Sequence, residues 1–175
     1  GNPSPVFDIL AWNRDCTNLP AALHEDYLNI FNDNLLAIPG GFKIHGEPLD
    51  LNQITQDAFV VGTVADHLTP WQGCYGTTQL LGGDTEFVLS SAGHVAGLVN
   101  PPGNPKAFYM TGPEPGDDPA DWEAAAQRHV GSWWEYWVRW AATRSGKLQR
   151  ARKTLGSRKH PVLAKAPGTY VFEVP

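Results

Sequence analysis

The chain has 175 residues, of which 42% are hydrophobic and 18% charged, values typical of a globular protein. No run of about 18 apolar residues exists to cross a bilayer and no secretory signal precedes the first strand, so we expect a cytoplasmic protein without a membrane span. The formal net charge of -5 is unevenly distributed, because residues 139–175 hold 9 basic and 1 acidic side chains. Without interleaved aromatic residues, this basic segment does not predict nucleic-acid binding.

The first predicted elements are a helix and a short hairpin. Apolar residues at helical spacing predict a helix over residues 21–31, with Thr17 or Asn18 as its N-terminal cap. Residues 42–45 and 49–51 alternate between apolar and polar side chains on either side of a Gly-Glu-Pro turn, and this pattern predicts a hairpin. Pro48 places that hairpin at a sheet edge, because proline cannot donate to a strand ladder.

A strand, a helix and a second strand follow. Apolar runs predict strands over residues 59–63 and 86–89. Between them, Pro70 suits the first turn of a helix over 71–81, which Gly82-Gly83 ends. This order predicts a parallel crossover unit.

The last part of the chain is predicted to contain a rigid loop and one long helix. Three prolines and a glycine exclude regular structure over residues 100–105. Asp118 as cap and Pro119 at the first position predict a helix that continues to Gly146 and carries a tryptophan stripe on its buried face. Residues 168–174 are expected to add a strand or extended segment.

Two titratable residues follow the two predicted strands. Asp66 comes after the first and His94 after the second, and parallel strands carry chemistry at their carboxyl ends. A neutral imidazole can act as a general base, and a carboxylate that receives its N–H fixes the tautomer. Two simpler interpretations stay open: His94 is structural, or Asp66 caps the helix at Pro70 unless Thr69 does so instead.

The nucleophile that should precede an acid and a base in this order is missing. The α/β-hydrolase order requires Gly-x-Ser-x-Gly or its Cys variant upstream, and no such pentapeptide occurs. Cys74 follows Asp66 and lies inside a predicted helix, Cys16 has no strand before it, and Ser91 is too close to His94.

Neither a metal nor a cofactor is expected. The six histidines have no metal-binding spacing, and no glycine-rich phosphate loop is present.

Three motifs in order closely resemble the C-terminal half of poly(3-hydroxyalkanoate) synthases. The motifs are residues 7–20 (FDILAWNRDCTNLP), 65–71 (ADHLTPW) and 87–102 (FVLSSAGHVAGLVNPP). Residues 131–134 (GSWW) fit as well. The resemblance implies an α/β fold, namely the C-terminal part of an α/β-hydrolase core with the end of a cap subdomain. Residues 1–38 would end the cap, 39–146 would form the second half of the core with its tryptophan-rich helix, and 147–175 would be a basic tail.

The resemblance also implies an acyltransferase that polymerises (R)-3-hydroxyacyl-CoA and releases coenzyme A through a Cys-His-Asp triad. Asp66 and His94 match the family's acid and base, and the Cys would lie upstream, so the 175 residues alone are predicted to be inactive. Trp12, Asp15 and Asn18 match cap or access positions. The expected partners are the acyl-CoA substrate, the growing polyester, the remainder of the synthase chain and a second copy in a homodimer, at the surface of a polyester granule.

Two other functions stay open. An esterase or polyester depolymerase would keep the fold and place Ser in the missing motif. A non-catalytic paralogue would instead bind polymer granules or a partner synthase through its aromatic helix and basic tail.

Overall fold

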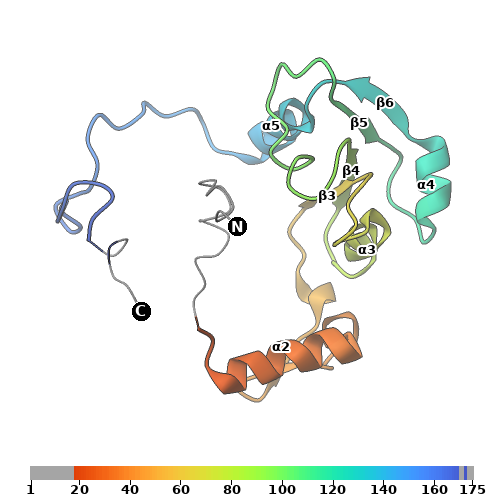
Figure 1. The fold of residues 1–175 in the computed structure, drawn as a ribbon, viewed down its shortest axis with the longest axis horizontal. Coiled ribbons are helices and arrows are strands. Elements are labelled where there is room, and N and C mark those ends of the chain that lie inside the picture. The colour runs from red at the N-terminus through yellow and green to blue at the C-terminus, as the bar shows by residue number, and fades with distance from the viewer. Residues whose placement is uncertain (1–17, 170–171, 173–175) are drawn as a thin grey trace, which may run out of the picture. The chain divides into compact units, whose positions relative to one another are not determined.

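A computed structural model describes residues 18–169 and 172. The chain has a mixed α/β structure that divides into two compact units, one ending at Val138 and the other beginning at Arg139 (Figure 1). This division does not test the expected boundaries after residues 38 and 146, which stay predictions. Within the described residues, no helix has the length and apolar character needed to span a membrane.

Helix α2 spans Ala21–Asp33 and confirms the first predicted helix. Asn18 is not the expected cap, because Pro20 occupies the N-cap position and no side-chain hydrogen bond caps the helix there. Thr17, the other expected cap, lies outside the described residues. The proline φ of -56° suits the entry to a helix, and its carbonyl accepts the His24 N–H at 3.0 Å. No residue of α2 is buried.

The predicted hairpin is confirmed, but its expected turn is wrong, because Glu47 and Pro48 form a strand. The hairpin is also a separate two-stranded sheet and is not the edge of the main one. Strands β1 (Lys43–Ile44) and β2 (Glu47–Pro48) pair antiparallel. His45 and Gly46 form the two-residue turn with φ of 52° and 85°, both in the left-handed region that such turns require. Short 3-10 helices, η1 (Leu35–Ala37) and η2 (Leu51–Gln53), flank the hairpin.

The main sheet has the strand order β3-β4-β5-β6. Strands β3 (Ala58–Thr63) and β4 (Thr85–Ser90) are parallel and are joined by α3 (Trp71–Gly76) and η3 (Thr77–Gln79), which confirms the crossover unit. The helix expected over 71–81 tightens into 3-10 geometry at Thr77. Glycines within α3 weaken it, and the Thr78 hydroxyl donates to the Tyr75 carbonyl at 2.8 Å.

The rest of the sheet corrects the sequence prediction of one long final helix. Strand β5 (Phe108–Thr111) pairs antiparallel with β4, and β6 (Gln127–Val130) pairs antiparallel with β5. Helix α4 (Pro119–Ala125) precedes β6 and α5 (Trp133–Arg144) follows it. The cap at Asp118 is confirmed, because its Oδ1 accepts the Ala120 N–H at 2.7 Å.

A local break at residues 131–132 explains the error. Gly131 has a φ of 108°, which only glycine adopts readily, and the chain turns there from β6 into α5. Ser132 caps α5, accepting the Trp134 N–H at 3.1 Å. Val130 therefore lies in a strand, 80% exposed, and does not belong to the helical stripe.

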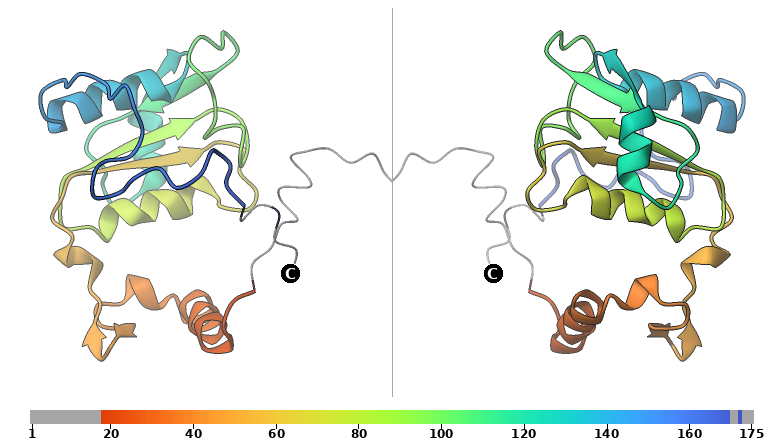
Figure 2. Two further views of the ribbon diagram at one scale, coloured as in Figure 1. Left: turned by 90° about the vertical axis from the view of Figure 1, so that its left-hand side faces the viewer. Right: turned by 90° about the vertical axis from the view of Figure 1, so that its right-hand side faces the viewer.

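Helices cover both faces of the main sheet (Figure 2). On one face, aromatic side chains of α3 and α4 pack around Phe87, and a Cβ at Gly62 would lie 3.0 Å from the Cβ of Trp71, so α3 lies close against β3. On the opposite face, Trp133 of α5 stacks on Phe59 of β3 with ring centroids 6.1 Å apart. The predicted tryptophan stripe is thus only partly core, because Trp137 is 41% exposed.

After α5, residues 145–169 contain neither helix nor strand, and almost all of their side chains are exposed. Most of the strand expected over 168–174 lies outside the described residues.

Candidate active site

Two loops at the same edge of the sheet form the candidate site. The loop after β3 carries Asp66 and the loop after β4 carries His94, and the parallel pairing of the strands brings both loops together. The strand ladder continues into them, because the Ala65 N–H donates to the Ala92 carbonyl at 3.0 Å. Gly93 fits against this contact: a Cβ there would lie 3.3 Å from the Ala65 carbonyl oxygen.

Asp66 and His94 are in direct contact. His94 Nδ1 lies 2.9 Å from Asp66 Oδ2 and 3.1 Å from Oδ1. The Asp66 side chain is only 4% exposed, whereas that of His94 is 41% exposed. The structure therefore brings together the two residues that the sequence predicts, with the carboxylate covered and the imidazole accessible. Their catalytic roles stay a prediction.

The Asp66 carboxylate is held by its own loop. Its Oδ1 accepts the N–H groups of Leu68 and Thr69, both at 2.9 Å, and its Oδ2 accepts the Thr69 hydroxyl at 2.7 Å. Desolvation by burial raises the pKa of Asp66, but the hydrogen bonds from Thr69, His94 and Leu68 outweigh it and hold that pKa well below its ordinary value. The carboxylate is thus ionised at neutral pH.

Both capping interpretations for this loop are wrong. Helix α3 has Pro70 at its N-cap position and no side-chain cap there. Asp66 instead closes the turn that precedes Pro70, and the Thr69 hydroxyl donates to Asp66.

The ionised carboxylate fixes the tautomer of His94. Asp66 offers only acceptors, so a hydrogen bond at His94 Nδ1 requires the proton on that nitrogen. The lone pair of a neutral imidazole then lies on Nε2. This arrangement suits a general base whose imidazolium is stabilised by a neighbouring anion.

Two threonines were not identified from the sequence as partners of the Asp66 carboxylate. Thr69 donates to the carboxylate as described, and the Thr63 hydroxyl approaches Oδ2 at 3.4 Å. The spacing Thr-x-x-Asp-x-x-Thr is visible in the sequence and could have identified both as carboxylate partners.

The described candidates for a nucleophile within the chain do not fit that role. Burial raises the pKa of Cys74, and the charge of Asp66 raises it further, the reverse of what activates a thiol. The Ser91 hydroxyl is engaged as an acceptor for the Phe108 N–H at 3.0 Å. Cys16 lies outside the described residues.

The expected cap or access positions remain untested. Trp12 and Asp15 lie outside the described residues, and Asn18 is exposed.

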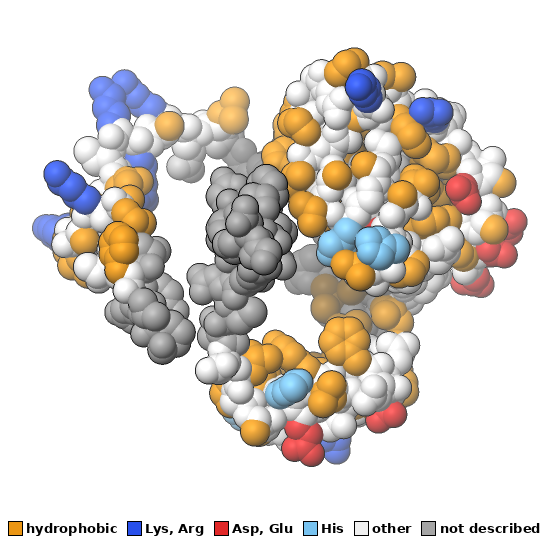
Figure 3. Space-filling model, viewed as in Figure 1, with side chains coloured by type: hydrophobic (Ala, Val, Ile, Leu, Met, Phe, Trp, Pro, Cys, Tyr) orange, Lys and Arg blue, Asp and Glu red, His pale blue; other side chains and the backbone are white. Residues whose placement is uncertain are grey.

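Exposed hydrophobic side chains border the Asp66–His94 pair. Val64 and Leu68 from the first loop and Val95 from the second are 45%, 62% and 61% exposed. Figure 3 shows a face on which histidine side chains lie beside hydrophobic ones. An apolar surface at this point could contact an aliphatic substrate or another part of a larger protein.

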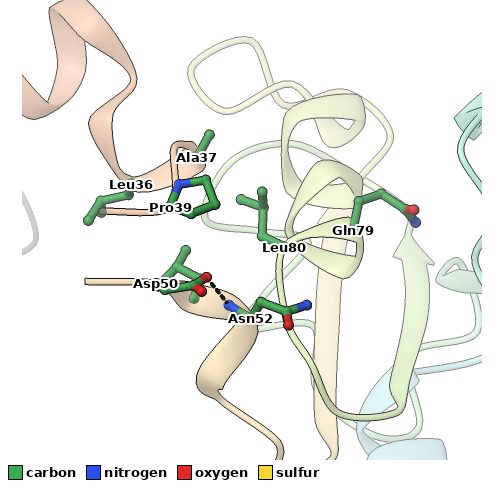
Figure 4. Close-up of a pocket in the computed structure, with 8 residues that line it drawn as sticks. Leu36, Ala37, Pro39, Asp50, Asn52, Gln79 and Leu80 are labelled. Atoms are coloured by element: carbon green, nitrogen blue, oxygen red, sulfur yellow. Dashed lines mark hydrogen bonds between the residues drawn. The ribbon is translucent and has the colours of Figure 1, made fainter. Parts of the chain in front are cut away.

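A hollow of about 400 Å³ lies elsewhere in the first unit and contains neither member of the pair (Figure 4). Its lining residues are Leu36, Ala37, Pro39, Asp50, Leu51, Asn52, Gln79 and Leu80. The Asp50 carboxylate that lines it is engaged locally, accepting the Asn52 N–H at 3.0 Å.

Within residues 18–169, no group of three or more His, Cys, Asp or Glu side chains could hold a metal ion. The expectation that the protein uses neither metal nor cofactor stays a prediction.

The known proteins that the chain is similar to share one name, poly(3-hydroxyalkanoate) polymerase. The chain is 48% identical to poly(3-hydroxyalkanoate) polymerase 2 of Ectopseudomonas oleovorans and 46% identical to polymerase 1 of the same organism, over 98% and 99% of its own length. It is 37% identical to a poly(3-hydroxyalkanoate) polymerase subunit of Cupriavidus necator over 98% of its length. The chain spans 31%, 31% and 29% of these three relatives. No protein-family model matches it.

Proposed function

Because the chain is homologous to the poly(3-hydroxyalkanoate) polymerases along nearly all of its length, we propose that it is the C-terminal part of such an enzyme. In this proposal residues 39–146 form the second half of an α/β-hydrolase core, 1–38 the end of a cap and 147–175 a basic tail. The parallel β3-α3-β4 unit supports the hydrolase assignment, with an acid and a base at its carboxyl end. The single observation that carries the catalytic part of the proposal is the 2.9 Å contact between His94 Nδ1 and Asp66.

The first proposed step is transfer of an acyl group to a thiol. His94 Nε2 takes the proton of a cysteine thiol, and the thiolate attacks the thioester carbonyl of a 3-hydroxyacyl-CoA. The bond to the CoA sulfur breaks, and the imidazolium returns its proton so that CoA leaves as a thiol. Asp66 keeps the imidazole oriented and stabilises its cationic form.

The second step forms the polyester. His94 accepts the proton of a 3-hydroxyl group, the alkoxide attacks the enzyme-bound thioester, and an ester bond replaces the bond to the cysteine sulfur. The released thiolate is reprotonated by the imidazolium, which restores the starting state. Asp66 either orients His94 in this step or assists the hydroxyl directly.

Several parts of the complete enzyme follow from the same proposal. The cysteine would belong to the portion of the relatives that this chain does not span, in a Gly-x-Cys-x-Gly turn after a strand. No metal or cofactor takes part in either step. The polymerase would be a homodimer at the granule surface, with the acyl-CoA and the growing polyester as its ligands and Trp12, Asp15 and Asn18 near its entrance.

The test uses the full-length protein that contains this chain. We expect it to release CoA from 3-hydroxybutyryl-CoA and form polymer, and His94→Ala to lower the rate by about 10⁴-fold or more. His67→Gln is the matched control, because His67 is an exposed neighbour of Asp66 that should leave the rate unchanged. The 175 residues alone should be inactive.

Two results would reject the proposal. Ester hydrolysis without CoA-dependent polymerisation would favour the depolymerase, with Ser as nucleophile. Granule binding without turnover, unchanged by His94→Ala, would favour the non-catalytic paralogue.

A further inference from the structure

The loop that carries His94 is tied to the start of α5 by three consecutive residues, which we call the α5 clamp. Each residue donates a side-chain hydrogen bond to a backbone carbonyl of the loop. The bonds are Ser132 Oγ to Asn100 O at 2.6 Å, Trp133 Nε1 to Gly97 O at 2.9 Å and Trp134 Nε1 to Leu98 O at 2.8 Å. Three successive residues therefore hold a segment that begins three positions after His94.

Gly97 links the clamp to the backbone next to His94. Its N–H donates to the Gly93 carbonyl at 2.9 Å, and Gly93 directly precedes His94. Its carbonyl, which accepts the Trp133 indole, also accepts the Ser90 hydroxyl at 2.9 Å. The peptide groups on both sides of Gly97 are thus held, and the one that carries its N–H closes the turn that contains His94.

Gly97 also packs against the surroundings of Asp66. A Cβ at this position would lie 2.4 Å from Thr63 Cγ2, so only a glycine allows this approach. Thr63 is one of the two threonines whose hydroxyl faces the Asp66 carboxylate. Gly97 therefore contacts both the turn that contains His94 and the threonine beside Asp66.

The clamp is itself anchored to the sheet. Trp133 stacks on Phe59 with an angle of 26° between the rings, and the Tyr136 hydroxyl donates to Glu86 at 2.8 Å. Phe59 and Glu86 are paired residues near the starts of β3 and β4, and the loops of Asp66 and His94 follow the ends of the same strands. Helix α5 thus connects both ends of this strand pair.

We propose that Trp133 and Trp134 are positioning residues, whose indole N–H groups hold the His94 loop in the register that keeps the imidazole against Asp66. This role rests on the polymerase function proposed above. Tryptophan is required because its ring packs as an apolar group while its N–H can only donate. A phenyl ring preserves much of the packing and removes the donor.

The test compares full-length polymerase with its Trp133→Phe/Trp134→Phe variant. We expect kcat for CoA release to fall by roughly 10- to 100-fold while KM stays within about twofold, because misplacement of a base slows chemistry without removing substrate contacts. Amide hydrogen exchange of peptides covering residues 93–99 should accelerate in the variant. His94 itself is left intact.

Trp122→Phe is the matched control. Its indole also donates to a backbone carbonyl, that of Pro113 at 3.1 Å, and the residue is 2% exposed in the core. It should lower the melting temperature at least as much as the clamp variant while leaving kcat and exchange over 93–99 unchanged.

The possible outcomes separate the two proposals. Wild-type kcat in the clamp variant, or an equal loss of kcat in Trp122→Phe, would overturn the positioning role. If the wild-type protein releases no CoA, the proposed function fails, and the exchange comparison alone then decides: unchanged exchange over 93–99 rejects the clamp and selective acceleration supports it.

Discussion

The loops after β3 and β4 and the segment 145–169 are both irregular, but their hydrogen bonds differ in reach. In the two loops, bonds join residues far apart in sequence, such as Ala65 to Ala92 and Trp133 to Gly97. In the segment, bonds close local turns, such as that between Ser157 and His160. Irregular backbone is therefore well positioned where its polar groups are satisfied by distant segments, and this is where the candidate site lies.

The largest effect on activity should come from removing the negative charge of Asp66, which accepts the hydrogen bond from His94. In Asp66→Asn the new amide can donate to His94 Nδ1 and favour the wrong tautomer. Under the proposed function, we therefore expect kcat for CoA release by the full-length variant to fall by about 10⁴-fold. Asp50→Asn is a matched control, because Asp50 also accepts the backbone N–H of the residue two positions later, but it caps η2. Equal activity of both variants would show that Asp66 only shapes its loop.

A second change tests the tight contact between the loops. Gly97→Ala places a methyl group against Thr63, and we expect a loss of about 1–3 kcal/mol in the free energy of unfolding. Thr63→Ser removes the nearest methyl group and keeps the hydroxyl, so the double variant should recover part of that loss. Chemical denaturation of the wild type, the two single variants and the double variant measures the coupling between the two positions. If the two losses in free energy of unfolding simply add, the contact between Gly97 and Thr63 is not the cause.

The lowered pKa of Asp66 predicts a pH-dependent stability. The folded-state pKa lies below the unfolded value of about 3.9, so the carboxylate stabilises the fold above that pH and loses this contribution as the pH falls further. The difference in melting temperature between wild type and Asp66→Asn should be largest near neutral pH and should narrow below about pH 4. A difference in melting temperature that is constant with pH would contradict the lowered pKa of Asp66.

The smallest effect should come from segment 145–169, whose hydrogen bonds to other described residues are all local. Replacing Lys147, Arg150, Arg152 and Lys153 together by Gln changes exposed side chains only. We expect each of the four substitutions to alter the free energy of unfolding by no more than about 0.5 kcal/mol. A cooperative loss several times larger, measured by thermal denaturation, would show that the basic segment is packed as firmly as the loops.

The strand pair and the acid–base pair could be predicted because their signals are local. Apolar runs mark β3 and β4, and Asp66 and His94 follow them directly. Parallel pairing then brings the two together without any further information.

Strands β5 and β6 could not be recognised in the same way. Val130, Trp133 and Trp137 happen to fit a helical period, which conceals the end of a strand at Gly131. The hydrogen bonds from Trp133 and Trp134 to the His94 loop depend on the tertiary packing of α5, and no residue spacing in the sequence predicts them.

Strand β3 has β4 as its only neighbour among residues 18–169, so its other side has backbone groups that no described strand pairs. Such an edge is a template for β-augmentation, and under the proposed function other strands of the complete enzyme would pair with it. A fragment limited to residues 18–169 should therefore self-associate as its concentration rises. A monomer by light scattering at every concentration would show that this edge is already protected.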